Sequence, residues 1–468
     1  MDIYRNITEL ESDCRGLLEW ANGMRVLRIN QSAVQSQLID RLIDTAVFTD
    51  ELDLKRLLNR LIPAIALNLG IIPASLFGLY EAPIQSGPVY NRKTVPAINI
   101  RGLTYDVARA VFRAARKNKV GVFIFEIARS EIGYTKQEPA EYAACVLAAA
   151  IKESYRGPVF LQGDHYQVSS KKYAVDASAE IGALKNLIER SIEAGFYNID
   201  IDASTLVDLS KPTVAAQQET NARVTAELTG YIRQRQPAGV VISVGGEIGE
   251  VGKQNSTPDE LRAFMKQYRS FLAPGRPGIS KISVQTGTKH GGVVLPDGSL
   301  AEVEIDFGVL KTLSQIARQE FGLAGAVQHG ASTLPESAFS KFPENETAEI
   351  HLATGFQNII YDSAHFPSSL LKEINKYLLT HHSDERKTTD TEEQFFYKTR
   401  KKAFGPFKRL MWEMPRENIE AITGTLEDKF SFLFRQLGVT ETVDLVKSFT
   451  PAGIVTPPPP TPSCYGDG

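Results

Sequence analysis

The chain has 468 residues, of which 43% are hydrophobic and 23% are charged, a composition that is typical of globular proteins. Its formal net charge of −3 provides no global positive field, so nucleic acid is not predicted as a partner. Three scattered cysteines, Cys14, Cys145 and Cys464, show no paired spacing. They predict neither a disulfide framework nor a thiolate zinc site, and they fit a reducing, cytoplasmic location.

The first region, residues 1–88, is predicted to be helical, because apolar residues recur there at intervals of three and four. Its most apolar window, residues 61–80, contains Pro63, Gly70 and Pro73. A membrane span requires about twenty cleaner apolar residues, so this window is interpreted as a buried helix followed by a loop.

The middle region, residues 94–375, alternates strand-like and helix-like patterns. The eight strand-like segments are residues 95–100, 120–127, 158–163, 197–202, 240–245, 281–287, 324–330 and 356–362. This alternation predicts an α/β fold, a (β/α)8 TIM barrel with helical N- and C-terminal extensions. A doubly wound open sheet would alternate in the same way, but no GxGxxG sequence follows a strand to support it.

The last part of the chain divides into two segments. Residues 376–450 begin as a polar linker and become helical again, as a C-terminal extension. Residues 451–468 are rich in proline and are predicted to be a disordered tail.

Two adjacent polar residues, Asp164 and His165, follow the apolar run of the third strand. In a (β/α)8 barrel the reactive groups lie at the carboxyl ends of strands. Adjacent residues on a strand point to opposite sides, so these two side chains are expected to serve different purposes only if the strand ends and turns at Gly163.

Further polar residues occupy the corresponding places on other strands. Glu247 ends the fifth strand, His290 and His329 follow the sixth and seventh, and Asn358 lies in the eighth. Three histidines at three strand ends would form an open three-ligand metal site, although three hydrogen-bonded histidines beside glycines are the structural alternative. His351 lies in a helix-like stretch and is expected to be structural.

The ordered series of short motifs across residues 94–375 resembles one family. It comprises GDH, AGFYNIDIDAS, VGGEIG, GTKHG, QHGAS and NIIYD. The series resembles the class II, metal-dependent fructose-bisphosphate aldolases and their ketose-bisphosphate relatives. Residues 1–88 and 376–468 lie outside this resemblance.

The resemblance implies a role for each matching position. Asp164 would exchange a proton with the hydroxyl on C4 of the ketose, and Asn358 would contact the enediolate. The zinc ion, or another divalent metal, would be held by His165, His290 and His329, with Glu247 as a nearby metal-site carboxylate. The residues expected to bind substrate or its phosphate are Asn99, Gly291, Gly330 and Ser332.

The implied function is a zinc-dependent aldolase that reversibly cleaves a ketose bisphosphate. The default substrate is fructose 1,6-bisphosphate, cleaved to dihydroxyacetone phosphate and glyceraldehyde 3-phosphate in glycolysis. The phosphorylated sugar is the expected partner, with neither nucleic acid nor membrane, and the chain is expected to form a homo-oligomer. The alternatives are an aldolase for another phosphorylated or acidic sugar, such as tagatose 1,6-bisphosphate, and a non-catalytic aldolase-like subunit.

Several positions depart from the family pattern. Ala331 and Thr333 replace glycines after the seventh strand, and Glu250 is the candidate for the second acid/base. The residues expected to bind the metal therefore match the family, whereas those expected to bind phosphate differ from it. The candidates to supply positive charge are Arg101, Arg129, Lys289, Lys408 and Arg409.

Overall fold

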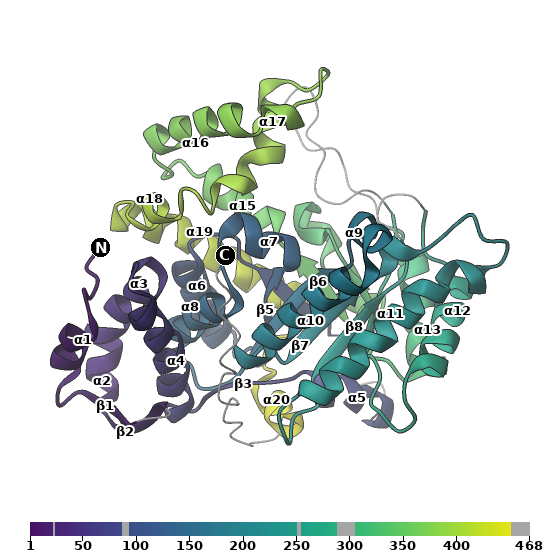
Figure 1. Cartoon of the computed structure of the whole chain (residues 1–468), viewed down its shortest axis with the longest axis horizontal. Helices are drawn as coiled ribbons and strands as arrows, with labels where there is room; N and C mark the ends of the chain where they lie inside the picture. The colour runs from purple at the N-terminus through teal and green to yellow at the C-terminus, as the bar shows by residue number, and fades with distance from the viewer. Residues whose placement is uncertain (22–23, 87–92, 250–253, 288–304, 451–468) are drawn as a thin grey trace.

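Eight parallel strands form a closed barrel in the computed structural model, which describes residues 1–21, 24–86, 93–249, 254–287 and 305–450 (Figure 1). The strands are β4 (Val95–Asn99), β5 (Ile124–Ala128), β6 (Gly157–Gln167), β7 (Asn198–Asp202), β8 (Ser243–Glu247), β9 (Lys281–Ser283), β10 (Ala326–Gln328) and β11 (Glu349–Leu352). Each strand pairs with the next, and β11 pairs with β4 to close the ring. The predicted TIM barrel is confirmed.

Helices surround the barrel in the order that the alternation predicted. They are α6 (Thr104–Lys117), α7 (Arg129–Thr135), α8 (Pro139–Lys152), α9 (Ser170–Val175), α10 (Ala177–Glu193), α11 (Val214–Arg235), α12 (Pro258–Phe271), α13 (Phe307–Phe321) and α14 (Lys341–Glu344). Local signals fix several ends: Pro258 opens α12, where Thr257 and Glu260 form a capping box, and Gly322 ends α13 in the left-handed region.

The eighth strand is not where the sequence pattern predicted it. Residues 356–362 lie mostly in the helix α15 (Thr354–Tyr361), and the strand is β11, seven residues earlier. The short apolar run around Ile359 and Ile360 fits either a strand or one face of a helix. The true strand has four residues, two of which, Glu349 and His351, are polar, so its apolar signal is weak.

The last barrel helix comes from the predicted C-terminal extension. After α15 the chain forms α16 (Ser368–His381), α17 (Glu392–Thr399), α18 (Lys408–Trp412), α19 (Arg416–Gln436) and α20 (Val443–Phe449). Helix α19 packs against α6, so it covers the barrel. The predicted boundary at residue 376 falls inside α16. Residues 362–415 are therefore an insertion, here called the arm, and Figure 1 shows its helices α16 and α17 above α15 and α7.

The N-terminal region covers one side and the lower end of the barrel. Its elements are α1 (Ile7–Cys14), β1 (Leu18–Ala21), β2 (Arg25–Ile29), α2 (Gln31–Ala33), α3 (Ile39–Phe48), α4 (Leu52–Asn68), β3 (Ile71–Pro73) and α5 (Phe77–Ser86). The helices α3 and α4 pack on α8, and β3 pairs with the start of β6. The hairpin β1–β2 and the strand β3 were not predicted. None of the described helices is long and apolar enough to span a membrane.

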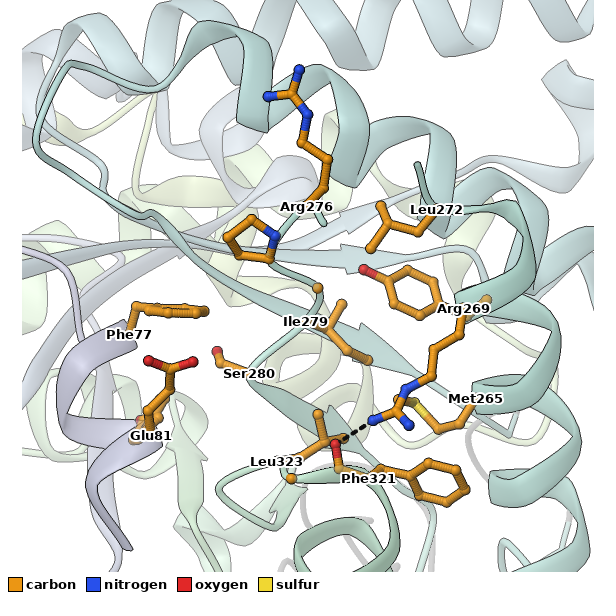
Figure 2. Close-up of a pocket in the computed structure, with 15 residues that line it drawn as sticks. Phe77, Glu81, Met265, Arg269, Leu272, Arg276, Ile279, Ser280, Phe321 and Leu323 are labelled. Atoms are coloured by element: carbon orange, nitrogen blue, oxygen red, sulfur yellow. Dashed lines mark hydrogen bonds between the residues drawn. The ribbon is translucent and has the colours of Figure 1, made fainter. Parts of the chain in front are cut away.

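A cavity of about 220 Å³ lies at the amino-terminal ends of the strands (Figure 2). Phe77 and Glu81 of α5 border it on one side, and Arg269 lies on the other, where it donates a hydrogen bond to the carbonyl of Phe321. Ser280 lines the cavity immediately before β9 begins. Since barrel enzymes use the opposite end of the strands, this cavity is not the candidate active site.

Candidate metal and catalytic site

The interior of the barrel contains ionisable side chains where aliphatic residues usually pack. Lys281 of β9 is 1% exposed and lies 2.9 Å from Asp200 of β7. Its ammonium also pairs with Glu349 of β11 and donates to Gln162 at 2.8 Å. Tyr80 of α5 approaches from the amino-terminal ends of the strands and donates a hydrogen bond to the second oxygen of Glu349. An unpaired buried charge would cost several kcal/mol, so the mutual pairing of these groups allows them to stay in the barrel.

A glycine on β8 leaves room for this cluster. A Cβ atom at Gly245 would lie 2.3 Å from Oδ1 of Asp200 and 3.1 Å from Cε of Lys281. Any larger residue at this position would therefore collide with the buried ion pair. This glycine belongs to the VGGEIG sequence, and close approach of side chains from the neighbouring strands explains it.

His351 connects the buried cluster to the carboxyl ends of the strands. Its Nε2 lies 2.8 Å from Glu349, and its Nδ1 lies 2.9 Å from Glu126 and 3.1 Å from Oδ1 of Asp164. Burial lowers the pKa of His351, but the charges of Glu126 and Asp164 outweigh burial and raise that pKa well above its usual value. The expectation that His351 lies in a helical stretch is wrong, because it occupies an interior position of the eighth strand.

A bulge in β6 allows both Asp164 and His165 to face the interior. The strand does not end at Gly163, as predicted, but continues to Gln167. Its pairing with β7 shifts register between Gly163 and Tyr166, and His165 has a φ of +38°, in the left-handed region. Two successive side chains therefore reach different partners from one strand.

His165 faces two carboxylates. Its Nδ1 lies 3.2 Å from Oδ2 of Asp202, on β7, and 3.2 Å from Oε2 of Glu247, on β8. Burial and the Asp202 charge raise the pKa of Glu247 to about 7, against the opposing effect of His165. A carboxylate behind an imidazole is the arrangement that orients a metal-binding histidine, since it accepts the N–H that does not face the metal.

His329 lies against both of the other histidines. Its ring centroid is 4.0 Å from that of His165 and 4.1 Å from that of His351. Its Nε2 lies 3.0 Å from Oγ of Ser283, and its Nδ1 lies 4.0 Å from Asp164. The structure thus brings together residues from β6, β9, β11 and the end of β10.

The donor set fits a divalent metal. One possible ligand atom each from Asp164, His165 and His329 lies within 4.8 Å of the others, and the same holds for His165, Asp202 and Glu247. Imidazole and carboxylate are suitable ligands for zinc. The predicted ligand His165 therefore lies beside each of the other two described ones, Glu247 and His329, and the role of all three as ligands stays a prediction.

Asn99 and Arg101 lie at the carboxyl end of β4, the first barrel strand, on one side of the barrel opening that is here called the mouth. The Asn99 amide donates to Glu131 at 2.5 Å, and its buried Oδ1 has no hydrogen-bond partner among the described residues. Arg101 donates to Glu131 at 2.8 Å and to Gln357 at 2.9 Å. Burial opposes the charge of Arg101, but Glu131 and Asp164 are near enough that its pKa is raised.

The loops after β10 and β11 meet beside this mouth. Gly330 follows β10 with a φ of +73°, and Ser332 accepts a hydrogen bond from the backbone N–H of Gly355, at 3.1 Å. Asn358 is on α15 rather than on a strand, and its side chain contacts Tyr397 at 3.0 Å and Arg400 at 2.7 Å. Its predicted position on the eighth strand is therefore wrong, because residues 354–361 form a helix. Its side chain faces the arm.

Four predicted residues lie outside the described part of the chain: Glu250, Lys289, His290 and Gly291. Of the other basic candidates, Arg129 pairs with Glu180, Lys408 pairs with Glu141, and Arg409 donates to the backbone of Phe48.

A family model for class-II fructose-bisphosphate aldolase matches residues 90–422. The chain belongs to the class II fructose-bisphosphate aldolase family. The match extends past the predicted boundary at residue 376 and includes the arm and the start of α19. The curated proteins contain no significant match.

Solved structures share this fold at low sequence identity. A fructuronate-tagaturonate epimerase from Cohnella laeviribosi is 12% identical, with a TM-score of 0.55, covering 81% of this chain and 86% of its own. A probable tagatose 6 phosphate kinase from Sinorhizobium meliloti 1021 is 17% identical, with a TM-score of 0.50, covering 78% and 96%. These likenesses show the barrel fold and indicate no particular substrate.

Within the aldolase barrel, sequence reasoning missed Asp202, Glu126 and Asp200. The signal was present in the strands themselves. Strands of a parallel barrel are usually apolar on both faces, so the alternating acids of NIDID and the single acid of IFEIA predict interior polar positions.

Proposed function

We propose that this chain is a zinc-dependent aldolase that reversibly cleaves a ketose bisphosphate, by default fructose 1,6-bisphosphate. The observation that carries the proposal is the position of Asp164 beside His165 and His329 at the carboxyl ends of barrel strands. Family membership supports an aldolase reaction, while the choice of sugar and of zinc rests on the resemblance and on the donor set.

His165 and His329 would hold the metal, with Glu247 and Asp202 as neighbouring carboxylates. His290 is the expected third imidazole. A divalent metal bound there would supply a Lewis acid that polarises the ketone carbonyl of the substrate. The contribution of the protein is to fix the imidazoles: Asp202 and Glu247 orient His165, and Ser283 contacts His329.

Asp164 is the proposed acid/base. In the cleavage direction it takes the proton from the C4 hydroxyl as the C3–C4 bond breaks, and in the reverse direction it returns that proton. Burial opposes ionisation of Asp164, but positive charge on the neighbouring imidazoles, His351 among them, and on Lys281 lowers its pKa, so the carboxylate form is available. His351 lies 3.1 Å from Oδ1 of Asp164, and we expect its charge to keep the carboxylate in this position.

Asn99 and the loops after β10 and β11 would hold the substrate. The buried Oδ1 of Asn99 can accept a hydrogen bond from a sugar hydroxyl, because the amide nitrogen is already committed to Glu131. The loop after the seventh strand, with Gly330 and Ser332, and the short helix after the eighth occupy the region where many barrels bind phosphate.

The test measures aldehyde release from fructose 1,6-bisphosphate and from tagatose 1,6-bisphosphate. We expect Asp164→Asn to keep its metal and its fold but to lose about a hundredfold or more in turnover, the usual scale for a lost acid/base. Asp208→Asn, an exposed carboxylate on the loop after β7, is the matched control and should retain turnover. Turnover of Asp164→Asn within a few-fold of the parent would leave Asp164 as a structural neighbour of His165.

A further inference from the structure

The arm adds a second basic residue to the group of side chains around Glu131 and Arg101. Lys401 lies in the short helix η8 (Arg400–Ala403), with its Nζ 5.9 Å from the ring centroid of Tyr134, on α7. Tyr134 contacts Glu131, the carboxylate that also binds Arg101. Among the described residues, the Lys401 ammonium has no hydrogen-bond acceptor and no ion-pair partner. Lys401 and Arg101 are thus connected through Tyr134 and Glu131. Burial, and then the charge of Arg101, lower the pKa of Lys401.

The position of Lys401 is fixed by the packing of the arm. A Cβ at Gly102 would lie 2.1 Å from the ring of Phe404, and one at Gly405 would lie 2.3 Å from the carbonyl oxygen of Tyr134. The residue before Lys401, Arg400, pairs with Asp362 and donates to Asn358 of α15. The backbone on both sides of Lys401 is therefore held against α7, α15 and the loop after β4.

The other basic side chains around this point already have partners. Lys402 pairs with Glu385, Arg400 with Asp362, and Arg129 with Glu180. Arg101 uses Nε for Glu131 and Nη1 for Gln357, and its side chain also lies within hydrogen-bond reach of the Tyr134 hydroxyl. The Lys401 ammonium thus remains available to an anion, with the Arg101 guanidinium as a second positive charge in the same group of side chains.

We propose that Arg101 and Lys401 form the receptor for a phosphate group of the substrate, with Lys401 supplied by the arm. The proposal rests on the proposed function, which makes the substrate a phosphorylated ketose. A phosphate monoester carries nearly two negative charges and three acceptor oxygens, so it can use both cations even though Glu131 neutralises part of the charge of Arg101. In this proposal, Lys401 of the arm supplies a phosphate contact in a barrel whose loop after the seventh strand departs from the family pattern.

The test compares Lys401→Met with Lys402→Met, a neighbouring lysine whose ammonium is paired with Glu385. Calorimetry with inorganic phosphate as the probe should show affinity about tenfold or more weaker for Lys401→Met, the scale of a lost hydrogen bond to a charged group. Lys402→Met should bind as the parent does, and Lys401→Arg should retain most of the affinity. Equal phosphate affinity in the parent and Lys401→Met, with both folded by circular dichroism, would overturn the receptor.

Two further measurements separate the receptor from the reaction. For fructose 1,6-bisphosphate, Lys401→Met should raise KM more than it lowers kcat, because it removes binding and leaves Asp164 in place. If the parent cleaves the sugar but KM is unchanged in Lys401→Met, the proposed phosphate receptor is wrong, whereas the proposed aldolase function is supported. If the parent cleaves no ketose phosphate yet binds phosphate through Lys401, the receptor stands and the proposed function fails. Binding of acetate instead of phosphate would contradict the phosphate assignment.

Discussion

Lys281→Met is expected to destabilise the barrel by about 3–5 kcal/mol, the cost of removing one partner from a buried ion pair. The substitution keeps the length of the side chain but removes the only ammonium among the described groups that face Asp200 and Glu349. Both carboxylates would then be buried without that counter-charge.

The size of the thermal effect follows from the length of the chain. Unfolding entropy of about 2 cal/mol/K per residue gives about 1 kcal/mol/K for 468 residues, so the expected loss corresponds to a Tm about 3–5 °C lower. Lys185→Met is the matched control. Lys185 pairs with Glu227 at 2.6 Å on the surface, and such pairs contribute about 1 kcal/mol or less.

Differential scanning calorimetry of the parent and the two variants measures this difference. Adding Glu349→Gln to Lys281→Met should recover part of the lost stability, because it removes one uncompensated charge. A Tm for Lys281→Met within 1 °C of the parent, or equal to that of Lys185→Met, would refute the view that Lys281 neutralises the interior.

Three other variants test separate parts of the structure. Gly245→Ala should destabilise the protein by about 1–3 kcal/mol, measured by urea unfolding, because the added Cβ would collide with Asp200. Gly182→Ala is the control, since the space around its Cβ is open, and it should be neutral or slightly stabilising. Burial and the charge of Asp106 raise the pKa of Asp44 from 3.8 to about 7. Between about pH 4 and 7 the folded state therefore keeps a proton that the unfolded state releases, so the stability of the protein should fall as pH rises through that window. Asp44→Asn should remove this slope and stabilise the protein at pH 8 by at most about 4 kcal/mol, and an unchanged slope in calorimetry across pH 4–8 would contradict the assignment. His351→Phe should lower kcat while the protein still binds metal through His165 and His329, and full turnover would exclude its role in holding Asp164.

The barrel could be predicted from the sequence because seven of its strands combine apolar runs with intervening amphipathic helices. The eighth could not, because Glu349 and His351 face an interior whose polarity depends on Lys281, a residue from another strand. Periodicity along the chain carries no information about a partner 68 residues away. The shift of this strand also misplaced Asn358 and concealed His351.

The pairing of Asp164 with His165 could be predicted, but the way in which both enter the site could not. Alternation along a strand predicts opposite faces, and the bulge that overcomes this alternation depends on pairing with β7. The partners of basic residues were also beyond prediction. Lys408 and Arg409 were expected to supply positive charge for phosphate, yet in the folded arm Lys408 pairs with Glu141 and Arg409 donates to the carbonyl of Phe48. Lys401, which was not predicted, lies over the ring of Tyr134 instead.

The most direct test of the account is metal content measured together with fructose 1,6-bisphosphate cleavage on the same purified samples. We expect about one divalent ion per chain, cleavage that stops after chelation and returns with zinc, and loss of both metal and cleavage in His165→Ala and in His329→Ala. His365→Ala, an exposed histidine of the arm, should behave as the parent. Full metal content and full cleavage in His165→Ala, or cleavage that survives removal of the metal, would contradict the central claim.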